Sequence, residues 1–224
     1  MTRNQEQIFD GKPVLQFDNE VDRRNFLRTA LIVGVGAGFA GHALGDPMSA
    51  SRSSAFAGNL AAKSPQGDLD ILNYALTLEY LEADFYTRGV KGGVLKGREL
   101  ELVSPIRDHE QEHVDVLTST VKSLGGKPAD KPEFMYPDGT FTDRSKFLMT
   151  ASVFEELGVK AYHGQVPLIE SGDILAAAAS IAGVESRHAA ILADLTGGDP
   201  FPRPIEATLP MKAVLAAAMP FIKS

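Results

Sequence analysis

From residue 68 onward, apolar side chains recur at intervals of three and four positions rather than alternating, which is the periodicity of amphipathic α-helices. Runs of β-branched residues, which would favour strands, are scarce in the same region. Asp68 is the expected N-cap of the first helix, which Gly89 and the glycines after it should end. The pattern predicts an all-α fold, with helices at about 68–86, 98–124 and 142–169 and a fourth from about Asp173 to the residues before Gly197.

The lengths of the connections predict how these helices are joined. Only short links separate the first helix from the second and the third from the fourth, so each pair is expected to form an antiparallel hairpin. Residues 127–141, rich in proline and glycine, are long enough to cross over from one hairpin to the other. The expected domains are a linker at 58–67, a four-helix bundle at 68–197, and at 198–224 a proline-rich strap with a short C-terminal helix, Met211–Ile222.

The first 57 residues have the pattern of a targeting segment. A basic region around Arg23 and Arg24 precedes the apolar, glycine-rich run 30–40, which is about half as long as a membrane-spanning helix. The paired arginines followed by Phe-Leu resemble a twin-arginine export signal, although Asp22 stands where that signal usually has Ser or Thr. The alternative is a buried glycine-rich helix or a dinucleotide-binding turn, which the lack of a preceding strand and of a following βαβ pattern disfavours.

Cleavage of this segment is expected after Ala57, in the sequence Ala-Phe-Ala, with Ala43 as a second candidate. The resemblance implies passage through the twin-arginine export machinery, which carries proteins that are already folded. We therefore expect a periplasmic or otherwise exported protein that can receive a cofactor before export.

The amino-acid composition excludes several kinds of partner and site for this chain. The 22 Lys and Arg residues are outnumbered by 29 Asp and Glu, and the net charge of −7 gives no overall attraction to phosphate backbones, so no nucleic-acid partner is expected. The chain has no cysteine, which excludes disulfides, thiolate zinc sites, iron–sulfur clusters and cysteine nucleophiles. Any bound metal must therefore use oxygen and imidazole ligands.

Ionisable side chains occupy positions on the apolar stripes of all four predicted helices. Buried carboxylates must be neutralised by protons, by basic partners or by cations, and these stripes hold too few Lys and Arg residues to do so. Bound metal is the favoured interpretation, and a protonated, hydrogen-bonded polar layer without metal is the alternative. The residues concerned are Glu79, Glu110, His113, Glu155, Glu185 and His188.

The spacing of these residues repeats. Glu110 and His113 form a Glu-x-x-His motif, as do Glu185 and His188, and this spacing places both side chains on one helix face where they can hold the same ion. The interval between the two motifs is nearly the interval between Glu79 and Glu155. The chain thus repeats a unit of one helix with a single inward Glu and one helix with Glu-x-x-His. His109 and His163 are expected to be peripheral.

This arrangement resembles the ferritin-like superfamily, whose di-iron and di-manganese members take one Glu from each of two helices and Glu-x-x-His from each of the other two. The segments 72–82 and 154–162 are similar to the bacterial and plant branch that includes desiccation-related proteins. The resemblance implies two iron or manganese ions per chain, with Glu79, Glu110, His113, Glu155, Glu185 and His188 as ligands. Rival ligands are Glu82 and Glu156, and Tyr86 and Tyr162 are candidates either for hydrogen bonds to the ligands or for ordinary core packing.

The leading functional hypothesis is an exported dinuclear metal protein that oxidises Fe(II) or removes peroxide in stress protection, with oxygen or peroxide as its small-molecule substrate. The alternative is a non-catalytic stress or desiccation-related bundle in which metal is only structural or absent. Iron storage would need a hollow cage, which nothing in the sequence predicts. The choice between iron and manganese and the formation of a homo-oligomer are left open by the sequence.

Overall fold

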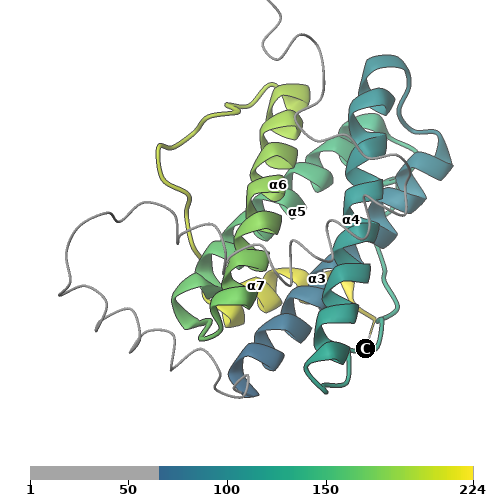
Figure 1. Cartoon of the computed structure of the whole chain (residues 1–224). Coiled ribbons are helices and arrows are strands. Elements are labelled where there is room, and N and C mark those ends of the chain that lie inside the picture. The colour runs from purple at the N-terminus through teal and green to yellow at the C-terminus, as the bar shows by residue number, and fades with distance from the viewer. Residues whose placement is uncertain (1–65, 224) are drawn as a thin grey trace, which may run out of the picture. The chain divides into compact units, whose positions relative to one another are not determined.

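The computed structural model describes residues 66–223, and the predicted all-α architecture is confirmed there. The bundle helices are α3 (Gln66–Gly92), α4 (Gly97–Ser123), α5 (Arg144–Gln165) and α6 (Gly172–Thr196), followed by the short α7 (Met211–Ala218) (Figure 1). Two single 3₁₀ turns, Val166–Leu168 and Met219–Phe221, follow α5 and α7. The predicted signal segment and most of the predicted linker lie outside the described residues.

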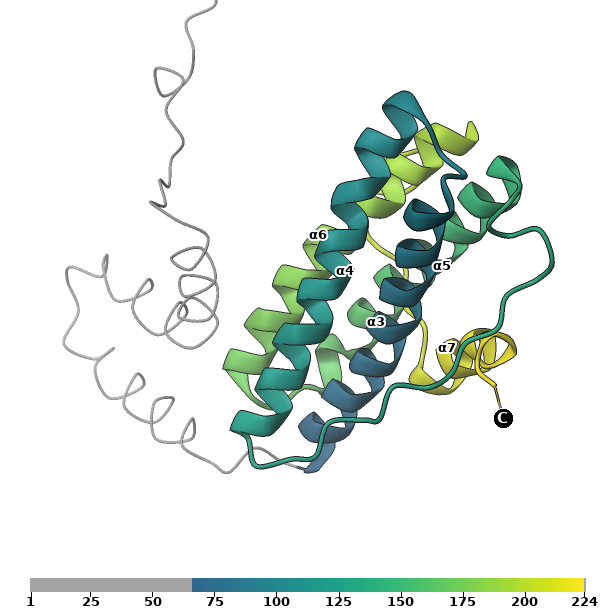
Figure 2. The ribbon, with the colours of Figure 1, turned by 90° about the vertical axis from the view of Figure 1, so that its right-hand side faces the viewer.

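The four long helices form two hairpins, as the short links predict. Helix α3 packs against α4, and α5 packs against α6. The connection from α4 to α5 runs along the bundle from one end to the other, so that it joins the two hairpins as a single crossover (Figure 2). The faces of all four helices that carry the candidate ligands are thereby turned toward one shared interior.

The first helix extends beyond the predicted end at Gly89. A Cβ atom at this position would overlap the ring of Phe147, so Gly89 serves close packing between α3 and α5 and does not end the helix. Asp68 likewise lies inside α3 and is buried. Its carboxylate accepts hydrogen bonds from the backbone N–H groups of Glu170 (3.0 Å) and Ser171 (2.9 Å), so it fixes the link between α5 and α6.

The other helix ends follow the expected local chemistry. Asp143 caps α5 by accepting a hydrogen bond from Lys146 N at 2.9 Å, and Ser171 caps α6 through Ile174 N. Helix α6 ends at Gly197, whose φ of 77° is readily available only to glycine. The third helix ends earlier than predicted, because the α-helix gives way at Val166 to a 3₁₀ turn containing Pro167.

Two apolar clusters flank the middle of the bundle. One is aromatic and includes Phe85 and Phe147, whose rings stack with centroids 4.7 Å apart. The other is mainly aliphatic and includes Leu76 and Ile181. Helix α7 belongs to the aromatic cluster through the fully buried Val214. None of the described helices combines the length and apolar character needed to cross a membrane.

The C-terminal segment is held against the crossover. Met135 N donates a hydrogen bond to Phe221 O, and Lys223 N donates one to Glu133 O, both at 2.9 Å. Phe134 and Ile222 form an isolated antiparallel bridge, the only β-type pairing within residues 66–223. The predicted short C-terminal helix is therefore present and fastened to the outside of the bundle.

Candidate metal centre

The six side chains that the sequence singled out meet in the interior of the bundle. Each of the four long helices contributes, because a Glu-x-x-His spacing or a single inward Glu places the polar group on the core face. The four carboxylates are completely buried, and both imidazoles are at least nine-tenths buried. The members are Glu79 of α3, Glu110 and His113 of α4, Glu155 of α5, and Glu185 and His188 of α6.

The first of two ligand groups surrounds His113. Its Nδ1 atom lies 3.1 Å from Glu79 Oε2, 3.2 Å from Glu110 Oε2 and 3.1 Å from Glu185 Oε1. One ring N–H can donate to only one of these oxygens at a time. Three carboxylates therefore converge on a point where the protein offers a single proton.

The second group surrounds His188 in the same way. Its Nδ1 atom lies 3.0 Å from Glu110 Oε1, 3.2 Å from Glu155 Oε2 and 3.8 Å from Glu185 Oε2. Within each group, one ligand atom from every residue lies within 4.8 Å of all the others. Glu110 and Glu185 belong to both groups, so the geometry is compatible with two adjacent cation positions that share two carboxylates.

The residues present fit a pair of divalent cations. Glu110 Oε1 and both carboxylate oxygens of Glu185 are buried and accept no hydrogen bond, although ring nitrogens lie close to them. Such atoms are costly to bury without a partner. Four ionised carboxylates would be balanced by two divalent cations, and a set of oxygen and imidazole donors suits iron or manganese. This part of the bundle is therefore compatible with a dinuclear metal site.

Without cations, protons must carry the compensating charge. Burial is the main cause that raises the pKa of Glu79 to about 8, and burial with the charge of Glu185 raises the pKa of Glu155 well above its usual range. Burial also acts to raise the pKa of Glu110, but the two neighbouring imidazoles outweigh it and lower that pKa. Although burial acts to lower the pKa of His188, Glu155 and its neighbours raise it to about 12. In the metal-free centre the pKa values of Glu79 and Glu155 are therefore raised, and those of Glu110 and Glu185 are lowered by the neighbouring imidazoles.

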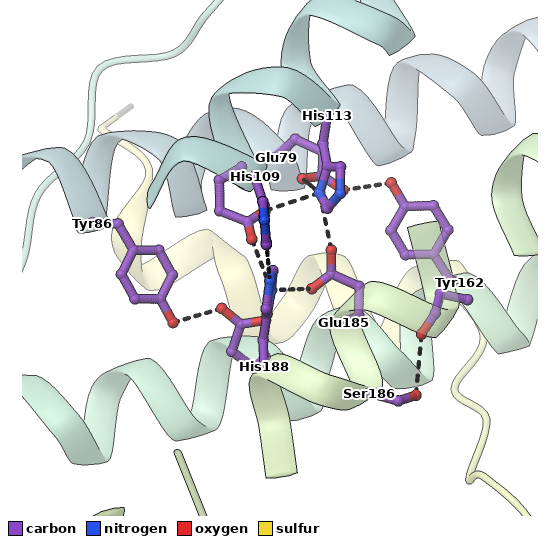
Figure 3. A network of polar contacts seen from close by, with 11 residues as sticks. Glu79, Tyr86, His109, His113, Tyr162, Glu185, Ser186 and His188 are labelled. Atoms are coloured by element: carbon purple, nitrogen blue, oxygen red, sulfur yellow. Dashed lines mark hydrogen bonds and ion pairs between the residues drawn. The ribbon is translucent and has the colours of Figure 1, made fainter. Parts of the chain in front are cut away.

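Two tyrosines form hydrogen bonds to Glu79 and Glu155, the two carboxylates that each belong to only one ligand group. Tyr86 Oη donates a hydrogen bond to Glu155 Oε1 at 2.5 Å, and Tyr162 Oη donates one to Glu79 Oε1. Figure 3 shows the two rings on opposite sides of the centre with their hydroxyl groups turned inward. The tyrosines therefore fill core positions and also orient Glu79 and Glu155, so the two interpretations of these residues are compatible.

The two rival acids differ in where they lie. Glu82 is buried next to the centre but belongs to neither ligand group, and burial raises its pKa well above the usual range. A Cβ atom at Gly158 would lie 3.3 Å from Glu82 Oε1 and 3.4 Å from Glu185 Oε2, so this glycine leaves room for both acids. Glu156 is turned away from the centre, one position beyond Glu155 on α5, and pairs with Lys160 at 2.7 Å.

His109 is the polar residue whose position the sequence interpretation missed. Its side chain is exposed, as expected for a peripheral residue, but its Nδ1 atom lies 2.9 Å from His188 Nε2. Figure 3 shows its ring next to that of His188. The available signal was its spacing, since His109 precedes His113 by four residues and shares its side of α4.

Comparisons with known proteins agree with this architecture. Residues 67–198, more than half of the chain, match the family described as ferritin-like domain. A solved structure of a conserved hypothetical protein from Mycobacterium tuberculosis has 17% sequence identity and a TM-score of 0.52, covering 65% of this chain and 98% of that one.

A second solved structure, described as ferritin-like, diiron-carboxylate proteins from Bacillus anthracis strain Ames, has 21% identity and a TM-score of 0.49, covering 58% of this chain and 96% of that one. Among curated proteins, none matches this sequence. Because residues 67–198 match this family and fold as a four-helix bundle, the chain belongs to the ferritin-like domain family.

Proposed function

We propose that this chain is an exported protein that binds two iron or manganese ions and uses them to oxidise Fe(II) or to remove peroxide. The observation that carries the proposal is the pair of ligand groups that share Glu110 and Glu185. Two cations that share carboxylates lie close enough to act on one small molecule together. A site built only to stabilise the fold would not need two adjacent positions.

Bound iron would supply two-electron redox chemistry, in which oxidation of two Fe(II) to Fe(III) would reduce dioxygen, with two protons, to hydrogen peroxide. The protein side chains would orient the ligands and exclude bulk water during this reaction. The tyrosine hydroxyls hold Glu79 and Glu155 in fixed orientations. The apolar clusters on both sides of the centre exclude bulk water, which strengthens the electrostatic interactions inside.

The donor set does not distinguish iron from manganese. Carboxylates and imidazoles suit both metals, and either metal would bind oxygen, peroxide or water wherever the protein supplies no ligand. Peroxide removal with manganese and Fe(II) oxidation with iron are therefore two versions of the same proposal. Metal content decides between them.

Export is proposed from the N-terminal sequence alone. Arg23 and Arg24 followed by a short, glycine-diluted apolar run support passage through the twin-arginine machinery to the periplasm. Replacing both arginines by lysine should leave the precursor inside the cell, whereas the unchanged chain should be recovered outside the cytoplasm at a lower mass. Equal export of both chains would contradict this part of the proposal.

The second candidate function is a stress or desiccation-related bundle in which metal only stabilises the fold. The observation in its favour is that each ligand group draws on three helices, so bound ions would fasten the two hairpins together. In that case metal removal would lower the melting temperature, but the loaded protein would turn over neither Fe(II) nor peroxide.

The deciding experiment is elemental analysis of the full chain folded in cells supplied with both iron and manganese. About two ions per chain are expected, followed by Fe(II) oxidation or peroxide consumption according to the metal found. The matched control is Glu156→Gln, an acid next to Glu155 that faces away from the centre. A metal content near zero in the unchanged chain, or equal content in a Glu110→Gln, Glu185→Gln double variant, would overturn the proposal.

A further inference from the structure

A small, largely enclosed cavity lies inside the bundle next to the candidate metal centre. Its volume is about 30 Å³, and residues from all four long helices line it. Leu72 and Leu78 of α3, Leu117 of α4, and Ala178 and Ile181 of α6 form much of the wall, which is almost wholly apolar. None of the six candidate ligands is among the residues that line this cavity.

Tyr162 connects the cavity to the centre. It is one of the lining residues, and its hydroxyl group donates a hydrogen bond to Glu79. Glu79 in turn belongs to the ligand group around His113. A molecule in the cavity would therefore lie against a residue that is hydrogen-bonded to a candidate ligand of the His113 group.

The cavity also has a route toward the surface. Val116 and Thr120 of α4 and Ala177 and Ala178 of α6 line it and are only partly buried. These residues come from α4 and α6, which contact each other less than α3 and α5, the other pair of helices that joins the two hairpins. The seam between α4 and α6 is thus the side on which a small molecule can enter.

The size and the wall restrict what can occupy this space. A water molecule needs at least about 10–15 Å³ measured in this way, so the cavity has room for roughly two water-sized particles and excludes an organic substrate. Water is held in such places by two to four polar partners. Tyr74 and Gln165 are lining residues with unpartnered polar atoms, but those atoms are themselves buried and present almost no surface to the cavity.

We propose that this cavity is a binding place for dioxygen, through which the gas reaches the His113 side of the metal centre from the seam between α4 and α6. Dioxygen is apolar and diatomic, so it matches both the volume and the lining. The role of dioxygen as a reactant rests on the proposed function. Binding of a gas in the cavity does not, so it can be tested without metal. Hydrogen peroxide, which is polar, gains nothing from this route.

The first test uses xenon as a probe in pressurised crystals of the full chain. Xenon density is expected in the cavity of the unchanged protein, because dry apolar cavities bind this gas. Ala178→Leu places a larger side chain in the cavity wall and should abolish that density. The matched control is Ala179→Leu, an exposed neighbour on α6 that is not part of the lining, which should keep it.

Ala177→Leu is a second filling variant for the case that Ala178→Leu folds poorly. Ordered water hydrogen-bonded to Tyr74 or Gln165, with no xenon at the site, would overturn the proposal. This readout depends on the cavity alone, so it stands even if the chain binds no redox metal.

The second test compares two oxidants on the Fe(II)-loaded protein. Filling the cavity should slow oxidation by dissolved dioxygen at least fivefold while leaving oxidation by hydrogen peroxide and metal content unchanged. Ala179→Leu should resemble the unchanged chain with both oxidants. Xenon binding combined with an unaltered dioxygen rate in Ala178→Leu would refute the cavity as the gas route, whereas a loaded protein inert to both oxidants would refute the proposed function instead.

Discussion

His109 Nδ1 lies 2.9 Å from His188 Nε2, and the two imidazole rings are nearly parallel, with centroids 5.1 Å apart and planes 13° apart. His188 turns its other nitrogen, Nδ1, toward Glu110 and Glu155. If Nδ1 is to bind a cation, its proton must sit on Nε2, where His109 Nδ1 can accept it. Within residues 66–223, no side chain makes a corresponding contact with His113 Nε2. The two candidate cation positions therefore differ, because only the histidine of one has a hydrogen-bond partner for its second ring nitrogen.

Replacing His109 by alanine should weaken binding at the position formed by Glu155 and His188. Loss of a hydrogen-bond partner behind a metal-bound histidine typically costs about 10–100-fold in affinity. We expect one of two binding steps to weaken by that factor, measured by calorimetric titration of the metal-free chain with Mn(II). The step assigned to the His113 group should not change.

The matched control is Gln111→Ala, an exposed residue on the same turn of α4 that contacts Asp115 rather than the centre. It should bind both ions as the unchanged chain does. Equal weakening of both steps in His109→Ala would show that His109 supports the fold of α4 rather than one cation position.

Substituting a carboxylate that belongs to both ligand groups should remove more metal ions than substituting one that belongs to a single group. Glu110 and Glu185 belong to both ligand groups, whereas Glu79 and Glu155 belong to one each. Glu110→Gln should therefore reduce metal content from about two ions per chain to near zero, and Glu155→Gln should leave about one. Elemental analysis after dialysis measures this. A loss of one ion in both variants would show that Glu110 does not bridge.

Two glycines inside helices, Gly89 of α3 and Gly183 of α6, should respond oppositely to replacement by alanine. A methyl group at Gly89 would overlap the Phe147 ring, and we expect Gly89→Ala to cost about 2–4 kcal/mol of unfolding free energy. Gly183 is exposed on α6, and a methyl group there would meet no atom within 4 Å, so Gly183→Ala should stabilise by about 0.5–1 kcal/mol. Urea unfolding of the two variants checks both signs, and destabilisation by Gly183→Ala would refute the second.

The stability of the metal-free chain should fall as the pH rises from about 5 to 8. The folded chain holds a proton on Glu79 up to a pKa of about 8, mainly because of burial, whereas the unfolded chain releases it near the ordinary value of 4.5. A group with a raised pKa stabilises the fold below its unfolded pKa, and that stability is lost as the pH rises through the folded pKa. The raised pKa of Glu155 acts in the same direction.

Melting temperatures measured after chelator treatment at several pH values test this prediction. Glu79→Gln, which cannot ionise, should make the dependence shallower. The metal-loaded chain should behave in the opposite way, because cation binding requires deprotonated carboxylates and grows stronger with pH. A metal-free melting temperature that rises between pH 5 and 8 would contradict the assignment of the protons.

Helix periodicity in the sequence was sufficient to predict the bundle and the side chains that meet inside it. The positions of Glu79, Glu110, Glu155 and Glu185 on apolar stripes follow from local geometry, because a helix places residues three and four apart on one face whatever surrounds it. The same reasoning failed at Gly89 and Asp68. Local preference places both at helix ends, but their roles depend on Phe147 and on the link at Ser171, which come from distant parts of the chain.

Residue order alone therefore determined the fold class, the repeated unit of Glu and Glu-x-x-His, and the exclusion of thiolate chemistry. Only the tertiary structure decided that Glu110 and Glu185 are shared between two groups, that Glu156 points away, and that His109 stands behind His188. The physical reason is that a helical period fixes the direction of a side chain relative to its own axis. Distances between side chains of different helices depend on how the two hairpins pack, which no single helix encodes.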